Sequence, residues 1–198
     1  MRHLKSLTVS ACAAILLSAS ASAAPETFSI DANHSTIGFK IKHLFSYVTG
    51  RFGTVAGTLV LDPAKPESST VNVQIQVDSI NTGNEKRDAH LKSPDFFDAT
   101  KFPLMKFESK TVKQTGPDAA DVTGELTLHG VTKEVPLKVH FLGKGPGMKP
   151  GEIRAGFEAT AQIKRSEFGL VWNKVIEGTQ VVGDDVAISL EIEAVKQP

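Results

Sequence analysis

The segment GEIRAGFEATAQIK, residues 151–164, alternates apolar and polar side chains over the length of a long strand. The apolar positions are Ile153, Ala155, Phe157, Ala159, Ala161 and Ile163. Because successive side chains of a β-strand point to opposite faces, this spacing predicts a strand with one buried face and one wet face. Strands of this kind are typical of antiparallel sheets.

The same alternation recurs along most of the chain. We predict eight strands, near residues 36–45, 54–62, 70–80, 104–113, 120–129, 133–142, 152–164 and 184–195. Turn residues separate several of them, among them Asp62-Pro63 and His129-Gly130. Eight one-sided strands without a long parallel crossover indicate an all-β fold, an eight-stranded antiparallel barrel. A two-sheet sandwich remains the alternative, since alternation does not show closure.

Two segments break the alternation. Asn84 is a good N-cap for a helix over residues 85–92, which would end near Ser93-Pro94. Residues 165–178 form an irregular or helical excursion that contains Phe168 and Trp172.

The N-terminus has the features of a signal peptide over residues 1–23. Arg2 and Lys5 precede a short apolar stretch, and Ala21-Ser22-Ala23 fits the rule for signal-peptidase cleavage. The apolar stretch is too short for a good membrane span, so we expect no stable membrane insertion. Cleavage after Ala23 would remove the one cysteine and leave a single domain, residues 24–198. These features predict a bacterial periplasmic or secreted protein.

The charge of the mature chain argues against a nucleic-acid partner. The signal peptide holds two of the 22 basic residues and none of the 22 acidic ones, which leaves 20 against 22. A net charge near −2 provides no attraction for nucleic acid or anionic lipid.

The sequence carries no recognisable reaction centre. It lacks the Gly-x-Ser-x-Gly and His-Glu-x-x-His motifs, and its histidines show no spacing of metal ligands. His34 and His43 lie close in sequence, but they have opposite strand parity and should diverge. We therefore predict no catalytic residue, no metal site and no cofactor. His43 shares an apolar face and should belong to a wall, together with Ile37, Phe39, Ile41 and Phe45.

Several apolar residues cluster between the predicted strands, namely Phe45, Tyr47, Val48, Phe96, Phe97, Phe168 and Trp172. They either plug the ends of a barrel or rim the mouth of an apolar pocket. Small residues on inward faces, such as Ala159 and Gly124, are similarly ambiguous. They allow either tight interdigitation of a filled core or space for a guest.

A series of motifs resembles the YceI-like family of exported bacterial proteins. They are DANHS (31–35), TGRFG (49–53), HLKSPDFFD (90–98), GELTLHGVT (124–132) and RSEFG (165–169). The resemblance covers nearly the whole mature chain in the family's order. It implies a lipocalin-like eight-stranded antiparallel barrel with short helical lids that holds a long isoprenoid or similar lipid, and a binding protein instead of an enzyme.

We expect the ligand to contact the tunnel lining and its rim. The expected residues are Ile37, Phe39, Ile41, His43, Phe45, Tyr47, Val48, Asp95, Phe96, Phe97, Phe107, Phe157, Ala159, Arg165, Phe168 and Trp172. Tyr47, Asp95 and Arg165 are candidates for the polar head of the lipid. The expected partner is a lipophilic small molecule, and a homodimer is possible. An enzyme that modifies an isoprenoid lipid and a lipid-free, stress-related interaction module are the alternatives.

Overall fold

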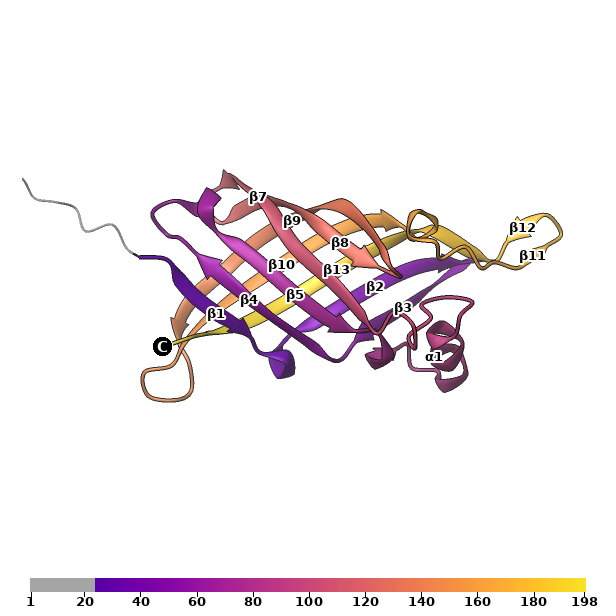
Figure 1. Cartoon of the computed structure of the whole chain (residues 1–198), viewed down its shortest axis with the longest axis horizontal. Coiled ribbons are helices and arrows are strands. Elements are labelled where there is room, and N and C mark those ends of the chain that lie inside the picture. The colour runs from indigo at the N-terminus through magenta and orange to yellow at the C-terminus, as the bar shows by residue number, and fades with distance from the viewer. Residues whose placement is uncertain (1–23) are drawn as a thin grey trace, which may run out of the picture.

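The computed structural model describes residues 24–198, which form a closed β-barrel with a short helix at one end (Figure 1). The predicted signal peptide, residues 1–23, lies outside the described residues. Within the described range, no helix is long and apolar enough to cross a membrane.

The strands are β1 Glu26–Ile30, β2 Thr36–His43, β3 Ser46–Phe52, β4 Val55–Leu61, β5 Thr70–Gln76, β6 Ile80–Asn81, β7 Leu104–Gly116, β8 Ala119–Leu128, β9 Val131–Pro146, β10 Ile153–Lys164, β11 Val175–Ile176, β12 Thr179–Gln180 and β13 Val182–Lys196. The α-helix is α1, Glu85–Lys92, and the 3-10 turns are η1 Ala32–His34, η2 Pro66–Ser68, η3 Val77–Ser79 and η4 Arg165–Phe168.

The first and last strands close the barrel. One edge of β13 pairs with β10, and its other edge pairs with β2 and then with β1, where Phe28 lies opposite Lys196. β1 and β2 therefore form one bent strand along β13, and β3 with β4 forms the next strand of the ring. Counted this way, the ring has eight antiparallel strands, which confirms the predicted barrel. The continuous pairing excludes the two-sheet sandwich.

The predicted strands lie close to the observed ones, but β1 and β3 were missed, as was the two-residue pair β11 and β12. The segment 165–178, expected to be irregular or helical, begins with the 3-10 turn η4 and ends in this short hairpin. β1 is a short alternation directly after the predicted cleavage site. β3 has a glycine at one of its inward positions, Gly50, so its apolar face is incomplete in sequence. A Cβ on Gly50 would lie 2.4 Å from the ring of Phe39, so the glycine makes room for that aromatic side chain.

The two ends of the barrel differ. The lid end carries α1 and the segment 165–181, and it lies on the right in Figure 1 with β11 and β12. The loop end carries the β4–β5, β7–β8 and β9–β10 connections and the C-terminus, on the left. The N-cap prediction for α1 is confirmed, since the side chain of Asn84 accepts a hydrogen bond from the backbone N–H of Arg87.

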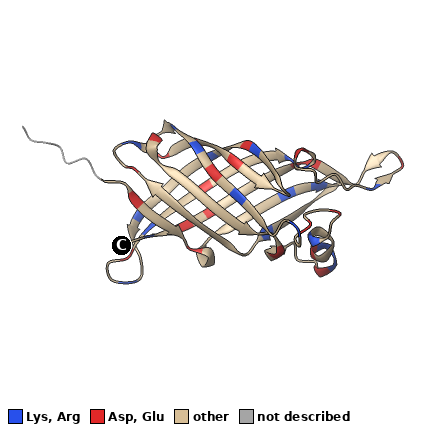
Figure 2. Ribbon diagram, viewed as in Figure 1, with Lys and Arg blue, Asp and Glu red and all other residues tan. Residues whose placement is uncertain are grey.

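Charged side chains mark the outer wall of the barrel. Lysine, arginine, aspartate and glutamate residues are distributed over most of the strands (Figure 2). Some pair between neighbouring strands, as Lys138 does with Asp121 at 2.7 Å and Lys164 with Asp185 at 3.0 Å. Exposed pairs of this kind contribute about 0–1 kcal/mol each, so they add little to the stability of the barrel.

Candidate functional site

The barrel is hollow. Its interior holds a cavity of about 920 Å³ that reaches from the loop end to the lid end and is lined mainly by apolar side chains from the strands around the ring. This volume lies near the upper end of the range for small-molecule pockets, about 300–1,000 Å³. An eight-stranded barrel can be just filled by its side chains or can hold one slender ligand, and this barrel has space for a guest.

The period-two alternation explains how the wall is built. Ile37, Phe39, Ile41 and His43 of β2 all line the cavity, whereas Lys40 and Lys42 between them are exposed. On β10, Phe157, Ala159 and Ile163 line the cavity in the same way. His43 is thus part of the wall, as its parity predicted.

The two small inward residues have different roles. A Cβ on Gly124 would lie 2.5 Å from the ring of Phe107, so this glycine allows close packing and leaves no space for a guest. Ala159 is 8% exposed and lines the cavity itself, where its small side chain leaves room.

An aromatic cluster covers the lid end of the cavity. The rings of His90 and Trp172 are 4.9 Å apart, and those of Phe96 and Trp172 are 5.1 Å apart. All three side chains line the cavity. His90 belongs to α1, and Trp172 belongs to the segment after η4, so the cluster joins the two lids.

Arg165 holds the segment after η4 in place. Its guanidinium donates hydrogen bonds to the carbonyl oxygens of Gly183 at 2.8 Å and Trp172 at 2.9 Å, and also to that of Leu170. The residue is 6% exposed and lines the cavity. Burial lowers the pKa of Arg165, because it removes water from the charged form, and the nearby Asp184 opposes this effect. An arginine pKa begins so high that the side chain stays charged at neutral pH.

The loop end of the cavity is lined by more acidic than basic side chains. Glu26, Asp62 and Asp118 line it, together with Lys144. Glu26 accepts hydrogen bonds from Lys144 and, at 2.9 Å, from Lys196. These two lysines lower the pKa of Glu26.

The structure places most of the expected ligand-contact residues on the cavity wall. Those that line it are Ile37, Phe39, Ile41, His43, Val48, Phe96, Phe97, Phe107, Phe157, Ala159, Arg165 and Trp172. The other four, namely Phe45, Tyr47, Asp95 and Phe168, do not line it.

Phe45 and Tyr47 lie outside the barrel wall. β2 ends at His43, and Leu44 takes a left-handed conformation with φ 48°, so the inward–outward alternation stops before Phe45. Phe45 is 98% exposed in the turn. Tyr47 pairs with Lys42 on the outer face, and the ammonium of Lys40 lies 4.3 Å from its ring centroid.

Asp95 and Phe168 are also placed differently from our expectation. Asp95 is exposed, and its carboxylate lies 2.9 Å from Nε2 of His90 on the solvent side. Phe168 is 1% exposed and belongs to the packed core beneath η4. It is a scaffold residue that supports the lid.

The sequence interpretation missed the residues that α1 contributes to the cavity. Arg87, His90 and Leu91 all line it. Their spacing of three and four residues places them on one face of the helix, but the helix is mainly polar, so no apolar stripe in the sequence marks that face.

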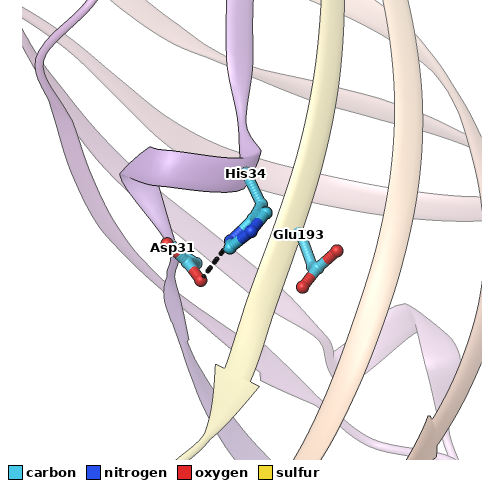
Figure 3. A group of neighbouring side chains, drawn as sticks. All are labelled: Asp31, His34 and Glu193. Atoms are coloured by element: carbon cyan, nitrogen blue, oxygen red, sulfur yellow. Dashed lines mark hydrogen bonds and ion pairs between the residues drawn. The ribbon is translucent and has the colours of Figure 1, made fainter. Parts of the chain in front are cut away.

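A second cluster of ionisable groups lies on the outside of the barrel, where Asp31, His34 and Glu193 come close together (Figure 3). Nδ1 of His34 is 2.8 Å from Asp31, and Arg154 donates to Asp31 at 2.8 Å and also to Glu193. The guanidinium of Arg154 thus provides a positive charge between the carboxylates. The hydrogen bonds from His34 and Arg154 lower the pKa of Asp31 to about 2. This ion-pair network ties η1 to β10 and β13.

Comparison with known proteins agrees with this architecture. A family model described as the YceI-like domain matches residues 28–194. A UPF0312 protein of Pseudomonas savastanoi pv. phaseolicola is 44% identical over 168 residues, 84% of this chain and 87% of the relative. The crystal structure of a Campylobacter jejuni YceI protein has a TM-score of 0.69 at 34% identity and covers 79% of this chain and 90% of that one.

A more distant structure shares the fold. It is described as a polyisoprenoid-binding domain from Saccharophagus degradans, implicated in plant cell wall breakdown. Its TM-score is 0.62 at 18% identity, and the match covers 86% of this chain and 98% of that one.

Proposed function

This chain belongs to the YceI-like domain family, and from that membership and its hollow barrel we propose that it binds a long apolar lipid in the cavity. The lipid class that we propose is a polyisoprenoid or a similar chain, as in the description of the Saccharophagus degradans domain. The single observation that carries the proposal is the cavity of about 920 Å³ with its apolar lining.

The energetics favour a hydrocarbon guest. Each buried methylene contributes about 0.8 kcal/mol, so a long chain can bind tightly without many polar contacts. The same physics gives little discrimination between chains that differ by one methylene. We therefore expect the cavity to select for an extended apolar shape more than for an exact chain length.

We propose a carrier or sequestering role without catalysis. Two polar groups at the lid end are engaged in structural contacts, since Arg165 binds carbonyl oxygens of the segment after η4 and His90 lies beside Asp95. A lipid-free interaction module would have no need of an open interior. The cavity therefore favours the carrier.

We also propose that the protein is exported, with cleavage after Ala23. A nearly insoluble lipid needs to be wrapped in order to cross an aqueous compartment, so export and lipid binding are consistent with each other. N-terminal sequencing of the exported protein should give Ala24 as the first residue.

The proposal is tested with delipidated protein and a long-chain prenyl alcohol. We expect the alcohol to co-elute with the protein in size-exclusion chromatography, at about one molecule per chain. If neither a prenyl nor an acyl chain of any length co-elutes, the proposal is wrong.

A further inference from the structure

The charged side chains that line the cavity are segregated along its length. At the lid end they are Arg87 and Arg165, and at the loop end they are three acidic residues and one lysine. Lys144 at the loop end is paired with Glu26, at 2.5 Å. The cavity therefore runs from a cationic end under α1 to an end with excess negative charge.

The two arginines keep their charge without a carboxylate partner. Within residues 24–198, neither Arg87 nor Arg165 forms a salt bridge. Arg87 donates from Nε to the hydroxyl of Thr82 at 2.7 Å and from Nη2 to its carbonyl at 2.9 Å. Nη1 of Arg87 has no hydrogen-bond partner in the part of the chain that the structure describes.

The acidic groups near the two arginines form hydrogen bonds with other residues and no ion pair with either guanidinium. Asp88 accepts from the backbone and hydroxyl of Thr82, and Asp95 lies against His90 on the exposed side. Asp184 accepts from the backbone and hydroxyl of Ser166. These carboxylates keep their negative charge, and that of Asp184 acts on Arg165, but none lies within ion-pair distance of the two guanidinium groups in the described residues. Nη1 of Arg87 therefore remains available to an anionic guest, and the attraction between them is stronger in apolar surroundings than in water.

Given the proposed lipid binding, on which this inference rests, we propose that the guest carries an oxyanion head that is held at the lid end beside Arg87 and Arg165. A carboxylate or a phosphate fits this chemistry, because guanidinium groups form strong, charge-assisted hydrogen bonds with both. The hydrocarbon tail then extends toward the loop end, whose acidic residues disfavour an anionic head.

The test compares lipids that share a chain and differ in the head. Delipidated protein is titrated with geranylgeranyl phosphate and geranylgeraniol, and in a second arm with palmitate and hexadecanol. We expect each anionic lipid to bind at least about tenfold more tightly than its alcohol, which corresponds to about 1.4 kcal/mol. The two arms show whether phosphate or carboxylate is preferred.

Two variants locate the head. Arg87→Gln removes the free cationic donor, and it should reduce the preference for the anionic lipid at least about fivefold while the alcohol still binds. Lys86→Gln is the matched control, since it makes the same charge change on the exposed side of the same helix and should leave the preference unchanged. Circular dichroism verifies that both variants are folded.

The orientation has its own readout. A lipid brominated next to the head should quench the fluorescence of Trp172 more strongly than one brominated at the tail tip, because Trp172 lies at the lid end. If the alcohols bind as tightly as the anionic lipids, or if the tail-labelled lipid quenches more, the inference is overturned and lipid binding stands. If no lipid of either kind binds, the proposed function itself fails.

Discussion

Replacement of Ala159 by phenylalanine tests whether the cavity is the lipid site. Ala159 lies on the inward face of β10 and lines the cavity, opposite Val139 on β9 and Leu190 on β13. The phenyl ring would project into the space that we assign to the guest. It would exclude about six carbon atoms of the chain, and at about 0.8 kcal/mol per carbon this is an upper limit of about 5 kcal/mol.

A flexible chain can shift and recover part of that loss. We therefore expect lipid binding to weaken by at least about tenfold for Ala159→Phe, measured by titration of delipidated protein. The urea midpoint of the ligand-free protein should change little, because the ring enters open space. In a filled core the same ring would cost about 1–3 kcal/mol through overpacking.

The matched control is Ala187→Phe. Ala187 is exposed on the outer face of β13, so the same change there should affect neither lipid binding nor the urea midpoint. A loss of stability in Ala159→Phe with lipid binding intact would refute the reasoning, because it would mean that lipid binds away from this wall.

Three further variants or probes test other parts of the account. Arg165→Lys should lower the free energy of unfolding by about 1–3 kcal/mol in urea, because an ammonium cannot replace the hydrogen bonds to the carbonyls of Leu170, Trp172 and Gly183; an unchanged midpoint would show that these bonds do not hold the lid. The pKa of Asp31 is lowered from 3.8 to about 2. The interactions of its carboxylate therefore stabilise the folded protein fully above pH 3.8, and this stabilisation is lost as the pH falls through 2. Asp31→Asn should accordingly cost about 1 kcal/mol at pH 7, allowing for solvent screening, and the difference from the natural protein should disappear near pH 2; a difference that is constant with pH would contradict the ion-pair account. Emission of Trp172, the one tryptophan in the sequence, should shift to the blue or be quenched when a prenyl alcohol enters, and constant emission during independently measured binding would show that its ring does not contact the guest.

The barrel wall could be predicted from the sequence because a strand enforces alternation. Ile37, Phe39 and Ile41 share a parity, and the pleat turns all three into the cavity. The rule fails where the strand ends. Leu44 has a left-handed conformation, so the inward–outward alternation of β2 does not continue to Phe45. The predicted rim therefore included two residues, Phe45 and Tyr47, that the structure places outside.

Other features depend on contacts between distant parts of the chain, and alternation does not encode them. Closure rests on the pairing of Phe28 with Lys196, at opposite ends of the chain. Phe168 lies in a 3-10 turn, where alternation does not predict the direction of a side chain. The structure places its ring in the packed core, whereas Trp172 lines the cavity. Arg87 was missed because a polar helix gives no apolar stripe to show which side faces the barrel.

Native mass spectrometry of the protein isolated from its host, followed by extraction of its guest, tests the central claim most directly. The account predicts a mass for residues 24–198 plus one lipid, and a long hydrocarbon chain in the extract. It would be contradicted by protein that carries no lipid after gentle isolation and takes up none when it is offered prenyl or acyl chains.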